Sequence, residues 1–172
     1  MHTAMRKLLA TGAAATALAG GLVGVTQAPS LADAGPTHIK RHTACNPKNH
    51  AGKITRTSAS AGHLHFRVSL VAKHGFACVL AGSPRIVRFY LGSHLLPFSA
   101  GHYGPQSKKV WFGPGHPVHF DIQVPNFGAT VLANHVTFRL RGPNGLFFFR
   151  SKAHGVLVVG PGTLIGPVMH GA

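Results

Sequence analysis

A strict alternation of apolar and polar side chains is the strongest structural signal in this 172-residue chain. In residues 63–70 every second residue is apolar, and the residues between are histidine, arginine or serine. The same period recurs in residues 118–124 and 136–141. Successive side chains of a strand point to opposite faces of a sheet, so this period indicates half-buried strands. Helical spacing of apolar residues is not sustained anywhere in the body of the chain.

Shorter apolar runs predict further strands at residues 76–80, 86–91, 109–112, 146–150 and 156–159. Most of the 22 Gly and 12 Pro lie between these runs, where turns are needed. We therefore expect an all-β fold, an antiparallel β-sandwich of about seven to nine strands. The alternation places a common set of residues in its core: Phe66, Val68, Phe120, Ile122, Val136 and Phe138.

The N-terminus has the layout of a secretory signal peptide. Arg6 and Lys7 precede a stretch rich in Ala, Gly, Leu and Val, and Ala32 and Ala34 form an A-x-A cleavage site. A retained membrane anchor is the alternative, although the stretch is weakly apolar for a permanent span. We expect a signal peptide at 1–34, a flexible tail at 35–44, a β-sandwich domain at 45–162 and a C-terminal tail at 163–172. The mature protein would then be secreted, extracellular or associated with the cell wall, with no transmembrane span.

Cys45 and Cys78 are the only cysteines. An even cysteine count in an exported chain predicts a disulfide bond. Two free thiols or a thiolate metal site are the alternatives, which export disfavours. The wide separation of the two residues argues against a redox C-x-x-C pair.

A resemblance to a known family appears at residues 77–84, Ala-Cys-Val-Leu-Ala-Gly-Ser-Pro. This segment resembles the A-C-x-L-x-G-x-P signature of a domain of unknown function common in secreted and lipid-anchored proteins of high-GC Gram-positive bacteria. Residues 62–70 and 110–120 are similar to two further segments of that family, and the resemblance covers about residues 45–160. It implies an immunoglobulin-like sandwich outside the membrane and carries no catalytic residues. Ser83 departs from the family, which usually has an aromatic residue there, and the additional cysteines common near the family's C-terminal strands are missing.

Acidic side chains are almost absent. Asp33 and Asp121 are the only carboxylates, against 17 Lys and Arg, and the formal net charge is +15. Asp33 lies in the predicted signal peptide, so the mature protein would keep Asp121 alone and could not assemble paired carboxylates. No G-x-S-x-G elbow accompanies the Ser, His and Asp residues present. We therefore predict that the protein is not an enzyme. Asp121 is expected to form a cross-strand pair with an arginine or, alternatively, to orient a histidine.

The charge predicts binding to polyanions. The basic residues are scattered along the chain rather than clustered as in a nucleic-acid groove, so we expect nonspecific attraction to anionic envelope polymers, anionic lipids or extracellular DNA, without sequence-specific nucleic-acid recognition. The alternative is that the charge serves only solubility. The candidates for this diffuse binding are Arg67, Arg88, Lys108, Lys109, Arg139, Arg141 and Arg150.

A metal site is the alternative function. His63 and His65 share one strand face, a spacing that can chelate Zn²⁺ or Cu²⁺, and His119 is a possible third ligand if the strands are neighbours. The competing interpretation is that histidine fills polar surface positions in a chain that avoids acids. The sequence thus predicts no obligatory cofactor, a cationic binding module at the cell envelope and, as the alternative, an extracellular histidine-based Zn- or Cu-binding protein.

Overall fold

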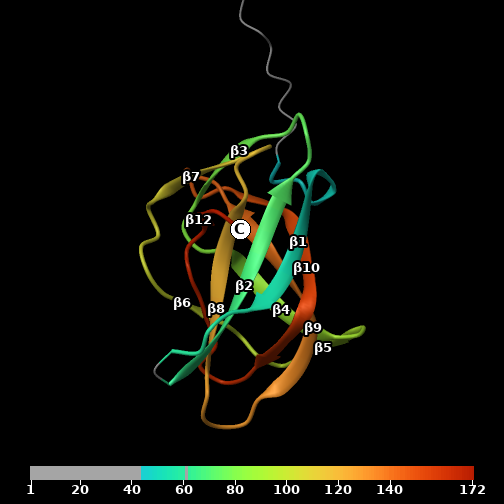
Figure 1. Ribbon diagram of the computed structural model, residues 1–172, viewed down its shortest axis with the longest axis vertical. Helices are drawn as coiled ribbons and strands as arrows, with labels where there is room; N and C mark the ends of the chain where they lie inside the picture. Colours follow the sequence, from blue (N-terminus) through green and yellow to red (C-terminus); the bar gives the residue numbers. More distant parts are fainter. Residues whose placement is uncertain (1–43, 61) are drawn as a thin grey trace, which may run out of the picture. The chain divides into compact units, whose positions relative to one another are not determined.

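The computed structural model describes residues 44–60 and 62–172, which belong to one unit of the chain, Ile39–Ala172. Their regular structure is β-strand apart from a 3-10 turn at Pro47–Asn49 (Figure 1). The predicted all-β class is confirmed. The strands are β1 (His50–Arg56), β2 (His63–Ala72), β3 (Cys78–Ala81), β4 (Arg85–Leu91), β5 (His94–Leu95), β6 (Gly101–His102), β7 (Lys109–Phe112), β8 (Val118–Pro125), β9 (Val131–Arg141), β10 (Phe147–Val159), β11 (Leu164–Ile165) and β12 (Met169–His170).

Ten of these strands form one sheet in the order β5-β4-β9-β10-β1-β2-β8-β11-β6, with β12 also paired to β8. The remaining strands, β3 and β7, form a two-stranded sheet. β1 pairs with β10 and β11 with β6 in parallel, whereas the other neighbours are antiparallel. The sheet is therefore mixed, while the sequence predicted antiparallel pairing throughout. Alternation within a strand does not specify which strand lies beside it, so the parallel pairs left no local signal.

The large sheet curls, and its two halves enclose the core. In Figure 1, β2 and β8 lie in front of β4 and β9. The rings of Phe120 on β8 and Phe138 on β9 meet edge to face, with centroids 5.0 Å apart. All six predicted core residues are buried, none more than 4% exposed. The alternation thus identified the apolar faces of both halves correctly.

Two glycines allow β1 to lie close to β10 in the middle of the sheet. A Cβ at Gly52 would lie 2.9 Å from the Cβ of Ala153, and a Cβ at Gly155 would press on the backbone oxygen of Ile54. Gly155 also has φ of +148°, a conformation that L side chains rarely adopt. The sequence predicted separate strands at 146–150 and 156–159, because the irregularity around Gly155 interrupts the alternation. The structure has one strand, β10, with a register shift at this point.

The C-terminal residues are part of the sheet. Ile165 in β11 pairs with Ile122 of β8, and Met169 in β12 pairs with His119. Ile165 and Val168 are buried. The predicted C-terminal tail at 163–172 is therefore wrong, because strands of two residues are too short to show a period. The predicted signal peptide and residues 35–43 of the predicted N-terminal tail lie outside the described residues.

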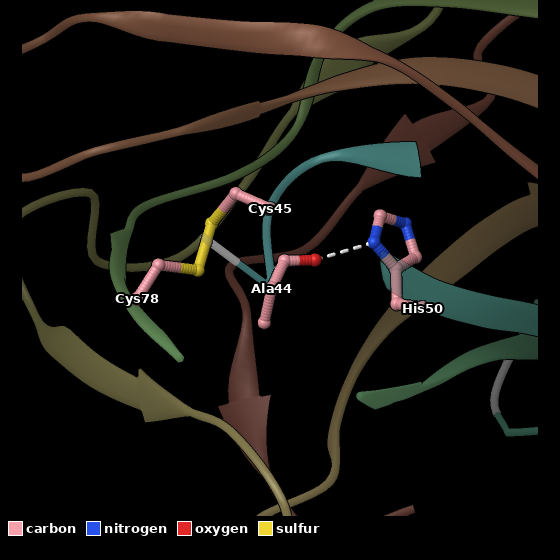
Figure 2. The surroundings of a disulfide bond; sticks show 4 residues. All are labelled: Ala44, Cys45, His50 and Cys78. Atoms are coloured by element: carbon pink, nitrogen blue, oxygen red, sulfur yellow. Dashed lines mark hydrogen bonds between the residues drawn. A yellow bond between two sulfur atoms is a disulfide. The ribbon is translucent and has the colours of Figure 1, made fainter. Parts of the chain in front are cut away.

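The Cys45–Cys78 disulfide is present, as predicted, and it joins the segment before β1 to β3 (Figure 2). Cys45 is fully buried and Cys78 is 8% exposed. Closing a loop of this length stabilises a fold by about 3–4 kcal/mol in the chain-entropy account. The bond therefore attaches the small β3–β7 sheet to the start of the strand at the centre of the large sheet.

A buried histidine lies beside the disulfide. The Nδ1–H of His50 donates to the carbonyl oxygen of Ala44 at 2.5 Å (Figure 2), and the ring meets Phe112 edge to face. Burial lowers the pKa of His50, with the positive charge of Lys73 acting in the same direction. The neutral imidazole is thus favoured here, and its hydrogen bond helps hold the turn that carries Cys45.

Candidate polyanion-binding face

The single acidic side chain in the described part of the protein is already paired. Asp121 on β8 lies opposite Arg67 on β2, and Arg67 Nε donates to Asp121 Oδ1 at 3.4 Å. Both side chains are partly exposed, at 36% for Arg67 and 18% for Asp121. The predicted cross-strand pair with an arginine is confirmed. No other lysine or arginine of residues 44–60 and 62–172 has an acidic side chain available to it.

Uncompensated cations gather on the outer face of four neighbouring strands, β4, β9, β10 and β1. Arg139 of β9 lies directly opposite Arg150 of β10. In the next row, Thr137 of β9 lies between Arg88 of β4 and Lys152 of β10. The strand register thus produces a patch that we call the cationic face, made of Lys53, Arg88, His135, Arg139, Arg150, Lys152 and His154.

The alternation of β9 and β10 explains why these side chains share one face. Ser151 and Ala153 of β10 are fully buried, so Arg150, Lys152 and His154 point away from the core. Neighbouring strands are about 4.8 Å apart, and like charges placed directly opposite each other destabilise a sheet. The Arg139–Arg150 pair therefore carries a repulsion that a bound anion would relieve.

Imidazole rings continue the cationic face toward β1. His135 lies between Tyr90 and His154 in register, and His154 lies opposite Lys53. The Tyr90 and His135 rings stack with centroids 4.8 Å apart, and His135 Nδ1–H donates to Asn134 Oδ1 at 2.9 Å. Burial lowers the pKa of His135, and the charges of Lys152 and His154 act in the same direction. His135 is therefore neutral near pH 7 and becomes a further cation in acid.

The residues predicted from the sequence include only part of the cationic face. Arg88, Arg139 and Arg150 belong to it, whereas Lys108 and Lys109 are exposed at the start of β7. Arg67 is paired with Asp121, and Arg141 is partly buried, its Nη1 donating to the carbonyl oxygen of Gln106 at 3.5 Å. Lys53, His135, Lys152 and His154 were missed, although the alternation of 150–154 could have revealed two of them had β10 been recognised as one strand.

The structure does not bring the three predicted metal ligands together. His63 and His65 are near each other, with ring centroids 6.4 Å apart, and His65 Nε2 lies 2.6 Å from the hydroxyl of Ser60. His65 lies opposite Gln123, and His119 is four residues away along β8, about 13 Å at the rise of a strand. His119 is 7% exposed, and its Nδ1–H donates to the carbonyl oxygen of Gly171 at 2.9 Å.

The metal prediction is therefore reduced to the His63–His65 pair. Protein Zn²⁺ sites use three or four protein ligands. Among the described residues, no group of three or more His, Cys, Asp or Glu side chains has the arrangement needed to hold a metal ion. The H-x-H pair alone thus provides fewer ligands than the predicted site required.

Comparison with known proteins finds no matching family, no matching curated protein and no matching solved structure. The resemblance to the secreted domain family thus stays a prediction. Within residues 44–60 and 62–172, no helix is long and apolar enough to cross a membrane.

Proposed function

We propose that this protein is a secreted, non-catalytic module that binds anionic polymers of the cell envelope through the cationic face. The observation that carries the proposal is the register of β9 with β10, which places Arg139 opposite Arg150 without a carboxylate beside them. A polymer with regularly spaced phosphates would neutralise this row together with Arg88 and Lys152. An immunoglobulin-like domain displayed outside the membrane is the architecture that we propose with it.

Two features of the chain support export. The N-terminal sequence has the layout of a signal peptide, and a disulfide is typical of oxidising compartments. Envelope polymers with phosphate groups are then the anions that such a protein would meet at high local concentration. The absence of base-reading elements in the sequence favours recognition of charge over recognition of nucleotide sequence.

The test is a salt series of binding to immobilised long-chain polyphosphate. The logarithm of affinity should fall linearly with the logarithm of salt concentration, because each phosphate contact releases a counterion. The triple variant Arg88→Gln, Arg139→Gln and Arg150→Gln should reduce the magnitude of this slope by about 3, one unit for each lost contact. Double-stranded DNA of varied sequence should bind with uniform affinity.

A matched control separates the cationic face from total charge. Lys48, Lys73 and Lys108 are exposed and lie outside the face, so Lys48→Gln, Lys73→Gln and Lys108→Gln remove the same charge elsewhere. This control should keep a slope within about one unit of the wild-type slope. An equal loss in both triple variants would show diffuse attraction without a dedicated face, and binding indifferent to salt would refute the proposal.

A further inference from the structure

An apolar groove opens where β1 and β10 separate. The two strands pair in parallel at Lys53 and His154, and the close approach of Gly155 to Ile54 follows at once. Beyond that point β1 continues beside β2, while β10 continues beside β9. A cavity of about 300 Å³ lies between the diverging pairs. It is lined by Arg56, Leu64, Phe66, Leu132, Val156, Leu157 and Val158.

The lining has one charged group on an otherwise apolar surface. Arg56 is exposed at the end of β1, opposite the buried Phe66 of β2. On the other side, Leu132 is 55% exposed and Val156 is 69% exposed. Large exposed apolar side chains that cluster around a concave site are typical of ligand-binding surfaces.

The charge of the groove is not neutralised within the described protein. Asp121, the single acidic side chain of the described residues, lies outside the groove and is paired with Arg67. Arg56 is thus the group in this groove that can recognise a ligand headgroup, and a guanidinium matches a carboxylate through two parallel hydrogen bonds. The volume lies at the lower end of the ~300–1,000 Å³ range of ligand pockets, which suits one aliphatic chain better than two.

We propose that this groove binds a single-chain amphipathic anion, an aliphatic chain that carries a terminal carboxylate. The chain lies against Leu132, Val156 and the side chains on β2, and the carboxylate meets the guanidinium of Arg56. None of the residues that line the groove belongs to the cationic face, and the groove offers apolar contact as well as charge. It therefore does not depend on polyanion binding.

The test uses dodecanoate below its micellar concentration, measured by isothermal titration calorimetry on the whole secreted chain. Dodecanol supplies the same chain without charge, and acetate supplies the charge without the chain. We expect saturable binding of dodecanoate, at least tenfold weaker binding of dodecanol and no binding of acetate. Dodecanoate that binds no better than dodecanol, or acetate that competes with it, would overturn the proposal.

Substitutions test which side chains bind dodecanoate. Arg56→Gln should weaken dodecanoate binding to the level of dodecanol and leave dodecanol binding unchanged, while Arg56→Lys should restore part of the difference. Leu132→Asn should weaken both ligands, and because Leu132 is exposed the fold should tolerate the change. Arg139→Gln, a charge loss on the cationic face, should leave dodecanoate affinity within twofold.

Two outcomes would contradict this assignment. If Arg139→Gln weakens dodecanoate binding as much as Arg56→Gln does, the anion is held by general charge and the groove is not its site. If vesicles of two-chain anionic phospholipid bind in an Arg56-dependent manner while dodecanoate does not, the groove faces a lipid surface and does not take up a single chain.

Discussion

On the outer face of β2 and β8, Arg67 lies beside Asp121, whereas on the outer face of β9 and β10 Arg139 lies opposite Arg150. The first pair is a partly exposed salt bridge, and the second is a pair of like charges. Both faces belong to the same sheet and arise from the same alternation of apolar and polar residues. In a chain nearly without acids, the position of one carboxylate therefore decides where positive charge stays uncompensated.

β1 connects the two faces, because it pairs with β2 on one side and with β10 on the other. Lys53 of β1 belongs to the cationic face, and Thr55 lies opposite Arg67. The segment before β1 is held by the disulfide. The placement of the two faces thus depends on how firmly β1 is anchored.

The largest effect is expected from removal of that anchor. The double variant Cys45→Ala and Cys78→Ala should lower the free energy of unfolding by about 3–4 kcal/mol, because the unfolded chain regains the entropy of an open loop. Urea denaturation of the variant and of the oxidised wild type measures this loss. Reduced wild-type protein should match the variant, and a loss below about 1 kcal/mol would show that β1 is held by its neighbours alone.

Lowering the pH should increase the difference in positive charge between the two faces. The pKa of His135 is lowered from its ordinary value of 6.5 by burial and by its cationic neighbours, so the ring is neutral near pH 7 and takes up a proton in acid. Each added cation contributes about one further phosphate contact. We expect polyphosphate affinity at constant salt to rise several-fold between pH 7.5 and pH 5, as measured by retention on the immobilised polymer.

The control for this effect exchanges one histidine on each face. His135→Asn should remove part of the rise in affinity, while His65→Asn on the face of β2 should leave it unchanged. The lowered pKa of His135 means that acid, which raises polyphosphate affinity, lowers the stability of the fold. The unfolded chain binds the proton more readily, so the stabilising contribution of neutral His135 is lost as the pH falls below the pKa of the unfolded chain. An affinity that falls in acid, while the protein remains folded, would contradict the assignment.

The smallest effect is expected on the outer face of β2 and β8, where Arg67 is paired with Asp121. Asp121→Asn should cost less than about 1 kcal/mol of stability, because partly exposed ion pairs contribute little. It should also free Arg67 and raise polyphosphate affinity by less than about threefold, a fraction of one further contact. Thermal denaturation and the salt series measure the two quantities. The double variant Arg67→Gln and Asp121→Asn should return affinity to the wild-type value, and a larger gain would show that the face of β2 also binds polymer.

The strands and the core were accessible from the sequence, because their signal is local. The alternation in residues 63–70 and 118–124 identified the buried side chains Phe66 and Phe120, and the cysteine count identified the disulfide. Export stays a prediction, since the residues that indicate it lie outside the described structure. These successes share one property, that each pattern lies within a single strand or a single pair of residues.

The cationic face was only partly accessible, because it is a property of strand register. Arg139 and Arg150 lie on predicted strands that are close in sequence, but the positions of Arg88 and Lys53 depend on which strands lie beside β9 and β10. The break at Gly155 also concealed that 150–154 continue one strand. The groove at Arg56 was missed for the same reason, since β1 and β10 show no sign of pairing in sequence.

The parallel contact between β1 and β10 has a consequence for the order in which the chain folds. β1 begins at residue 50 and its partner ends at residue 159, so the central pairing of the sheet waits until most of the chain is available. Such non-local pairing slows folding, and until it forms β1 presents one open edge to other chains. A ribosome or a translocation channel that releases the protein gradually would therefore release an incomplete sheet, because β10, which completes its centre, emerges only after β1 to β9.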